Sequence, residues 1–271
     1  HIYRSNLYEE RLRDMIDEGV RLIDLEDAAV GQINALSVAL LGDYAFGIPT
    51  RISAAARPGR AGIIDVERQA EMGGPIHTKG VLILEGYLGA HYGRQHVLAL
   101  SASLAFEQSY EGVEGDSASA AELIALLSAI ADVPLRQDIA ITGSVNQHGQ
   151  LQAIGGVNEK IEGFFAVCAR AGLTGTQGVI IPPSNARHLM LRHEIVAAVA
   201  TGRFHVWTCA SIDDAIGLLT GMEPGSVQAD GSYAEGTFNH AVMLRLADFA
   251  HTVAQAARES TAAALNSSRD S

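Results

Sequence analysis

Apolar residues recur along the chain with two different periods, and these periods predict a mixture of helices and strands. Spacings of three or four residues predict helices over residues 7–20, 78–92, 117–131, 159–171, 211–219 and 237–265. Short apolar or alternating runs between Gly- and Pro-bearing turns predict strands over residues 30–38, 47–56, 62–66, 97–106, 139–142, 151–153, 178–181 and 204–208. Helices and strands do not alternate regularly, so the order predicts an α+β sandwich of short strands and packed helices.

Changes in composition divide the chain into three parts. Residues 1–20 are predicted to form a connecting helix with acidic and arginine side chains on its outer face, and residues 21–225 to form the main domain. Residues 226–271 contain a Gly-, Ser- and acid-rich linker followed by an alanine-rich helix. We expect that helix to pack on the domain or on a neighbouring subunit.

Two residues are the strongest candidates for chemistry. Only two of the 19 Lys and Arg residues are lysines, and one of them, Lys160, falls early in an apolar helical pattern. Ser117 lies in the run Gly-Asp-Ser-Ala-Ser at residues 115–119. A serine hydroxyl is a weak nucleophile until a base takes its proton, and a desolvated lysine amine can be that base. Together the two residues indicate a Ser/Lys catalytic pair.

The local contexts suit this chemistry. Asp116 is a candidate N-cap for the helix over residues 117–131, which would place Ser117 beside unpaired backbone N–H groups that suit an oxyanion. Asn158 is a candidate cap for the helix that carries Lys160. A positive helix end and apolar neighbours such as Ile161 would both lower the pKa of the lysine.

Each motif also has a structural interpretation. Residues 119–122, Ser-Ala-Ala-Glu, fit a capping box, and a first-turn lysine is most often a solvated side chain. Spacing alone does not bring Ser117 and Lys160 together. A catalytically silent assembly module, in which both residues only cap helices, therefore stays open.

The block from residue 106 to 160 resembles the proteolytic domain of Lon proteases. Three motifs carry the resemblance: Glu-Gly-Val-Glu-Gly-Asp-Ser-Ala-Ser at 111–119, Ile-Thr-Gly-Ser at 141–144 and Ile-Gly-Gly-Val-Asn-Glu-Lys at 154–160. Gly-Asp-Ser-Ala-Ser is similar to the B-type branch, since A-type members typically carry Gly-Pro-Ser-Ala-Gly. The interval from Ser117 to Lys160 is the one that the family pattern requires. Segments 31–38, 42–47 and 73–80 also look like bacterial Lon-B-like proteins, so the resemblance covers about residues 20–220.

The resemblance implies a role for each matching residue. Ser117 would be the nucleophile, Lys160 the general base, and the Thr142 hydroxyl would orient the lysine amine. Asp116 would cap a helix, or would pair with Lys160 in a resting state. This sequence departs from the family in two places: Glu114 stands where many members have Asp, and Glu122 stands where an aliphatic residue is usual.

For the whole protein, the resemblance implies an ATP-dependent serine endopeptidase that degrades unfolded or damaged proteins as a ring-shaped homo-hexamer. Residues 21–225 would be its Ser/Lys protease domain, and residues 1–20 would connect to an upstream ATPase region. No Gly-Lys-Ser/Thr motif occurs in the chain, so we expect ATP and Mg²⁺ only in that region and no cofactor here. Another Ser/Lys hydrolase, of the signal-peptidase or self-cleaving repressor type, is the second enzyme hypothesis.

Composition narrows the function classes. The formal charge of −12 argues against a nucleic-acid-binding surface, which needs clustered Lys and Arg. The most apolar run, residues 97–106, is too short to span a membrane, and residues 1–4 show no signal-peptide core, so we expect a cytoplasmic protein. The two cysteines, Cys168 and Cys209, are expected to be buried small side chains in a reducing compartment.

The histidines are not expected to bind metal. The chain contains neither an H-E-x-x-H nor a C-x-x-C motif. His77 and His148 lie beside Gly-rich turns, and we expect both to be structural or exposed to solvent.

Overall fold

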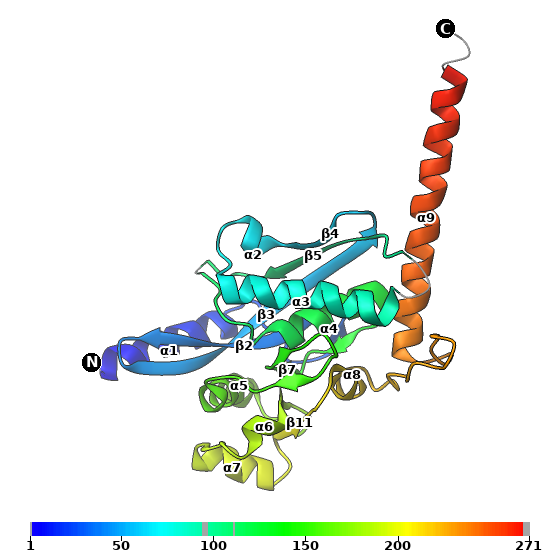
Figure 1. The fold of residues 1–271 in the computed structure, drawn as a ribbon. Coiled ribbons are helices and arrows are strands. Elements are labelled where there is room, and N and C mark those ends of the chain that lie inside the picture. The colour runs from blue at the N-terminus through cyan, green and yellow to red at the C-terminus, as the bar shows by residue number, and fades with distance from the viewer. Residues whose placement is uncertain (1, 94–96, 111, 268–271) are drawn as a thin grey trace.

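A mixed β-sheet with helices on both faces forms the body of the molecule (Figure 1). The computed structural model describes residues 2–93, 97–110 and 112–267. The strands are β1 (Ala28–Ala29), β2 (Gln32–Leu41), β3 (Tyr44–Pro58), β4 (Gly62–Asp65), β5 (Leu100–Phe106), β6 (Leu135–Arg136), β7 (Ile139–Ile141), β8 (Ser144–Val145), β9 (Leu151–Gln152), β10 (Gly178–Ile181) and β11 (His205–Thr208). The helices are α1 (Ile2–Asp17), α2 (Val66–Gln69), α3 (Pro75–Tyr92), α4 (Ser119–Ala131), α5 (Val157–Ala171), α6 (Pro183–Ala186), α7 (His193–Ala200), α8 (Ile212–Thr220) and α9 (Phe238–Ser267).

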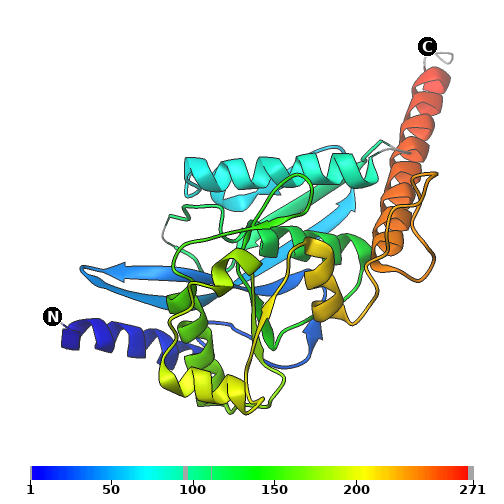
Figure 2. The same ribbon diagram turned by 60° about the horizontal axis from the view of Figure 1, so that its bottom comes forward.

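The main sheet has seven strands in the order β11-β10-β7-β2-β3-β5-β4. Strands β11, β10, β7 and β2 are parallel, β2, β3 and β5 are antiparallel neighbours, and β4 is parallel to β5. The long β2–β3 hairpin closes with a two-residue turn in which Gly42 has a φ of 61°, and its tip extends beyond the sheet in Figure 2. This mixed architecture confirms the predicted α+β class.

Residues alternate between two cores along the central strands. Ala35 and Ile180 face the core shared with α3, α4, α8 and α9, whereas Leu36 and Val179 face the core shared with α5 and α7. Because successive strand side chains point to opposite faces, one short apolar strand serves both cores. The sheet therefore holds α4 and α5 on its opposite faces.

Helix α4 lies at the centre of the larger core. All of its residues from Ser119 to Ser128 are buried, so it has no polar outer face. A helix that is surrounded by protein on every side is held firmly in place. The segment just before it, which contains Ser117, starts from this fixed helix.

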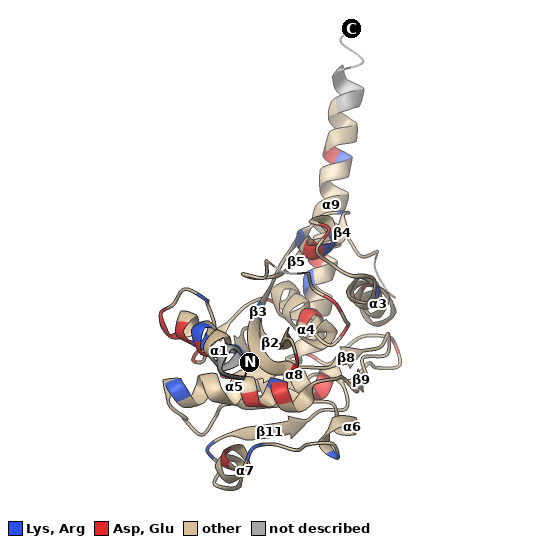
Figure 3. Ribbon diagram, turned by 90° about the vertical axis from the view of Figure 1, so that its left-hand side faces the viewer, with Lys and Arg blue, Asp and Glu red and all other residues tan. Residues whose placement is uncertain are grey.

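The two terminal segments are helical, as the periodicity predicts. Asp14 and Asp17 of α1 form ion pairs with Arg170 of α5, which places α1 beside that helix. In α9, Leu246 and Phe249 are buried in the larger core, and the later turns project away from the domain (Figure 1). The projecting part is drawn mostly tan in Figure 3 because it carries few charged residues.

Candidate active site

Ser117, Thr142 and Lys160 come from three separate segments and meet in one hydrogen-bonded group. Ser117 lies in the turn before α4, Thr142 follows β7, and Lys160 lies in the first turn of α5. The Lys160 Nζ atom is 2.9 Å from the Ser117 Oγ atom and 3.0 Å from the Thr142 Oγ1 atom. Both distances lie in the normal range for hydrogen bonds. The fold therefore brings together Ser117, Thr142 and Lys160, which the sequence analysis named as site residues.

The backbone around Thr142 holds the serine segment in position. The Gly143 N–H donates to the Ser117 carbonyl at 2.8 Å, and the Ala120 N–H donates to the Gly143 carbonyl at 3.1 Å. The Thr142 N–H donates to the Ile180 carbonyl and so extends the sheet by one residue. The turn before α4 is therefore tied to the sheet through two consecutive residues.

Thr142 holds one N–H of the lysine and restricts how the neutral amine can be oriented. The Thr142 hydroxyl donates to the Ser117 carbonyl at 3.2 Å, so its oxygen accepts an N–H of Lys160. A neutral amine has two N–H groups and one lone pair, and one N–H is used on Thr142. The lone pair can then face the Ser117 hydroxyl, which is the arrangement that a general base requires.

Lys160 is buried, and its environment lowers the pKa of the amine. Its side chain is only 3% exposed, and desolvation lowers its pKa to about 8, against a smaller opposing effect from the charge of Asp116. No carboxylate among the described residues forms an ion pair with it. Lys79, the other lysine, is exposed on α3.

Two glycines allow α5 to approach β3 closely enough to bring Lys160 to the serine. A Cβ atom on Gly47 would lie 1.9 Å from the Glu159 carbonyl oxygen, and one on Gly163 would lie 2.1 Å from the Gly47 carbonyl oxygen. Both contacts are with backbone, which cannot swing aside as a side chain can. The absence of side chains at these positions therefore sets the depth at which α5, and with it Lys160, sits against the sheet.

The predicted caps are wrong. Helix α4 begins at Ser119 with Ala118 at its N-cap, so Ser117 precedes the helix, and the Asp116 carboxylate accepts a hydrogen bond from the Ser144 hydroxyl at 2.9 Å. Helix α5 begins at Val157 after Gly156, whose φ of 66° is left-handed and favours glycine. Asn158 instead accepts a hydrogen bond from the Met190 N–H.

The capping-box interpretation of residues 119–122 is also wrong. The Ser119 hydroxyl accepts a hydrogen bond from the Val145 N–H, and Glu122 points toward His77. Neither Ser117 nor Lys160 caps a helix. The hypothesis of a catalytically silent module assigned a capping role to both residues, and the structure does not show that role. The sequence analysis did not predict the contact of Ser144 with Asp116, although Ser144 lies in the Ile-Thr-Gly-Ser motif at residues 141–144.

Ser117 and Lys160 line a cavity of about 870 Å³. Its wall combines apolar side chains with backbone of the serine segment, and Glu114 and Asp116 add carboxylates to it. The apolar lining includes Leu12, Met15, Ile48, Val113 and Ile154. None of the described residues accepts a hydrogen bond from the backbone N–H of Ser117 or Ala118. Glu111, the first residue of the serine motif, lies outside the described residues.

Comparisons with known proteins identify the family of the chain. Residues 111–221 match the family of the Lon protease (S16) C-terminal proteolytic domain. A Lon protease homolog of Escherichia coli strain K12 is 50% identical over 222 residues, which are 81% of this chain and 38% of that protein. One from Haemophilus influenzae is 45% identical over 80% of this chain and 36% of that protein. The archaeal Lon protease of Thermococcus kodakarensis is 32% identical over 68% of this chain and 28% of that protein.

The fold and the matched motifs define a peptidase domain. The chain belongs to the Lon protease family, of peptidase type S16, which confirms the resemblance seen in its motifs. It spans less than two fifths of the length of the two bacterial relatives. Within the described residues, no helix has the length and apolar character needed to cross a lipid bilayer.

Proposed function

We propose that this chain is the proteolytic part of a serine endopeptidase in which Ser117 is the nucleophile and Lys160 the general base. The observation that carries the proposal is the 2.9 Å contact between Ser117 Oγ and a buried Lys160 Nζ. A pKa of about 8 gives the lysine a substantial neutral fraction near physiological pH. The adjoining cavity provides room for a peptide segment.

The reaction is an acyl transfer in two stages. Lys160 takes the hydroxyl proton as Ser117 Oγ forms a bond to the scissile carbonyl carbon, and the resulting ammonium then protonates the leaving amine as the C–N bond breaks. Water attacks the acyl-enzyme in the second stage, with Lys160 again taking and returning the proton. Thr142 keeps the amine aimed at the serine in both stages.

The backbone before α4 offers donors for the oxyanion. The N–H groups of Ser117 and Ala118 are not used by other described residues, and they belong to the segment that carries the nucleophile. Donors held in a fixed position at the developing charge contribute strongly to acyl transfer. We assign these two groups to the oxyanion site.

The wider activity follows from the family. We propose that the whole protein degrades unfolded or damaged proteins in the cytoplasm, in an ATP-dependent manner and as a homo-hexamer. ATP and Mg²⁺ would act in an ATPase region outside this chain, and residues 1–20 would connect that region to the protease domain. The similarity to bacterial and archaeal Lon proteins supports this assignment.

Covalent labelling tests the proposed nucleophile. A fluorophosphonate should modify the chain once, with loss of fluoride, and peptide mass spectrometry should place the adduct on Ser117. Labelling of the unfolded chain should fall to the background level, because the reactivity of the serine depends on its contact with Lys160 in the folded state. An adduct on another serine, with casein hydrolysis blocked, would assign the reaction to a different residue.

Thr142→Val should reduce turnover while leaving the fold intact. The substitution keeps the shape but removes the oxygen that accepts the Lys160 N–H, so the amine loses its fixed orientation. We expect kcat to fall by roughly 10- to 1000-fold, as for other lost positioning contacts. Thr142→Ser, which restores the hydroxyl, should recover most of the activity. Equal rates for the Val and Ser variants would show that the hydroxyl does not position the lysine.

A further inference from the structure

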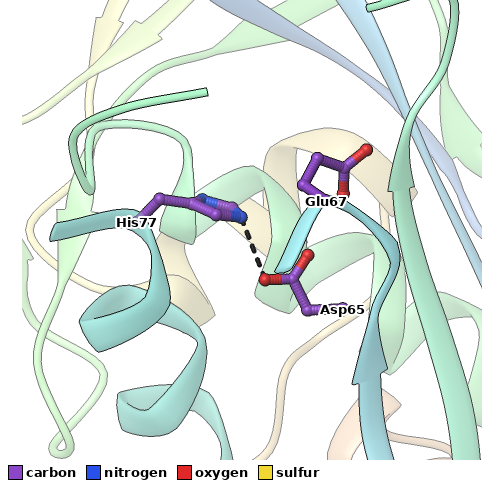
Figure 4. Close-up of side chains that lie close together, drawn as sticks. All are labelled: Asp65, Glu67 and His77. Carbon is purple, nitrogen blue, oxygen red and sulfur yellow. Dashed lines mark ion pairs between the residues drawn. The ribbon is translucent and has the colours of Figure 1, made fainter. Parts of the chain in front are cut away.

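A second group of ionisable side chains is buried away from the peptidase site. Asp65 ends β4, Glu67 lies in α2, His77 lies in the first turns of α3, and Glu122 lies in α4. These four side chains are between 1 and 5% exposed. Figure 4 shows the His77 ring directed at the Asp65 carboxylate, with Glu67 beside them.

The donor atoms of this group are close together and poorly satisfied. One atom each from Asp65, Glu67 and His77 lies within 4.8 Å of the other two. His77 Nε2 is 3.1 Å from Asp65 Oδ2, and His77 Nδ1 is 3.9 Å from Glu122 Oε1. Both Asp65 oxygens, Glu67 Oε2, His77 Nε2 and Glu122 Oε1 are buried and make no hydrogen bond of acceptable geometry.

Three carboxylates in one buried place are costly without a cation. Burial opposes each negative charge, and the charges also repel one another. No Lys or Arg side chain among the described residues forms an ion pair with any of them. A single neutral or protonated histidine cannot balance three carboxylates, so either shared protons or a bound cation must do so.

We propose that Asp65, Glu67 and His77 bind one divalent transition-metal ion, while the Glu122 carboxylate, which faces the other ring nitrogen of His77, orients the imidazole. Ligand atoms at about 2.0–2.2 Å from one ion lie roughly 3–4 Å apart, which the present spacing reaches with small side-chain movements. Carboxylate and imidazole donors in this combination suit Zn²⁺ or Mn²⁺. The ligands have no H-E-x-x-H or C-x-x-C spacing, so a search of the sequence for metal-binding motifs does not find them.

The ion would join the segments that surround the nucleophile. Its ligands come from the β4–α2 corner and α3, and Glu122 beside His77 belongs to α4, which begins two residues after Ser117. Helix α3 also contacts the serine segment, since a Cβ atom on Gly80 would lie 3.5 Å from the Asp116 Cβ and 3.6 Å from the Ser119 Cβ. Its role is therefore structural, and the proposal is independent of the peptidase mechanism.

Metal titration of the 271-residue chain tests the proposal. After dialysis against a chelator, the chain should bind one equivalent of Zn²⁺ or Mn²⁺ by calorimetry, and its unfolding midpoint should rise. When the free metal concentration is 100 times the Kd, the midpoint of thermal unfolding should rise by roughly 5–10 °C. His77→Gln and Asp65→Asn should weaken binding at least tenfold and lose the rise, because each removes a ligand. His148→Gln and Glu85→Gln, which change exposed side chains, are the matched controls and should behave as the parent.

The parent chain alone can overturn the proposal. Less than half an equivalent of either ion bound at micromolar concentration, with an unchanged unfolding midpoint, would mean that shared protons satisfy the carboxylates. Binding retained by both His77→Gln and Asp65→Asn would place the ion elsewhere. If either variant fails to fold, Glu122→Leu gives a third test, since it removes the carboxylate beside His77 Nδ1, introduces the aliphatic residue usual in the family, and should weaken binding.

Discussion

Ser117→Ala is expected to abolish peptide-bond hydrolysis while leaving the fold intact. The substitution removes the nucleophilic oxygen, and variants of this kind in other serine proteases lose roughly 10⁴- to 10⁶-fold in kcat. It deletes only a half-buried hydroxyl, so the free energy of unfolding should change by about 1 kcal/mol or less. The measurement is hydrolysis of unfolded casein, together with urea unfolding of the same preparation.

Ser119→Ala is the matched control for this experiment. The Ser119 hydroxyl accepts the buried Val145 N–H, so its loss should destabilise the fold by about 1–3 kcal/mol but leave most of the activity. Activity and stability should thus separate between two serines in one motif. Substantial casein hydrolysis by purified Ser117→Ala, confirmed by mass spectrometry, would end the assignment of Ser117 as nucleophile.

Lys160→Met should be inactive and yet at least as stable as the parent near pH 7. Desolvation lowers the pKa of Lys160 from 10.5 to about 8, so near pH 7 the folded state has to hold a charge that the unfolded chain carries freely in water. The cost at pH 7 corresponds to roughly 3 kcal/mol. Methionine fills similar space without a charge and therefore removes this cost.

The sign of the pH dependence follows from the same shift. Between about pH 8 and 10.5 the unfolded chain binds the extra proton, so the contribution of Lys160 to stability rises with pH over that range. The stability gap between Lys160→Met and the parent should therefore narrow towards pH 10. Other groups that titrate in this range are common to both proteins, so they largely cancel in the difference.

Urea unfolding at pH 7 and pH 10 measures this gap. Lys79→Met is the control, because Lys79 is the only other lysine in the chain and is exposed on α3. Its substitution should change stability little at either pH. A Lys160→Met variant that is clearly less stable than the parent at pH 7 would indicate a charged, paired lysine, held by Asp116, and would remove the neutral base from the mechanism.

The helix caps show where local sequence reasoning failed. Asp116 and Asn158 are good capping residues by type, but each finds a partner far along the chain: the Ser144 hydroxyl for Asp116 and the Met190 N–H for Asn158. At Ser211 the local rule holds, since that residue forms a capping box with Asp214 at the start of α8. A capping pattern predicts a cap only when no stronger distant contact competes for the side chain.

The buried metal-ligand candidates were beyond the reach of motif analysis. Asp65, Glu67 and His77, with Glu122 beside them, are contributed by four elements, and only the packing of α3 and α4 against the β4–α2 corner brings them together. Glu122 did stand out in the sequence as a departure from the family, and the structure supplies its context beside His77. The sequence analysis expected His77 to be structural or exposed, and it did not predict that His77 is buried beside three carboxylates.

Periodicity along the chain was enough to predict the α+β class, and residue types and local context made Ser117 and Lys160 candidates, because these are local properties of the sequence. The resemblance of the motifs to Lon proteases added the family and the role of Thr142. The tertiary structure alone decided that Lys160 Nζ lies 2.9 Å from Ser117 Oγ, that the amine is desolvated, and that both line one cavity. Those facts depend on how closely α5 packs on β3 at Gly47 and Gly163. Such packing is a relation between distant segments, and it is set by their combined shapes.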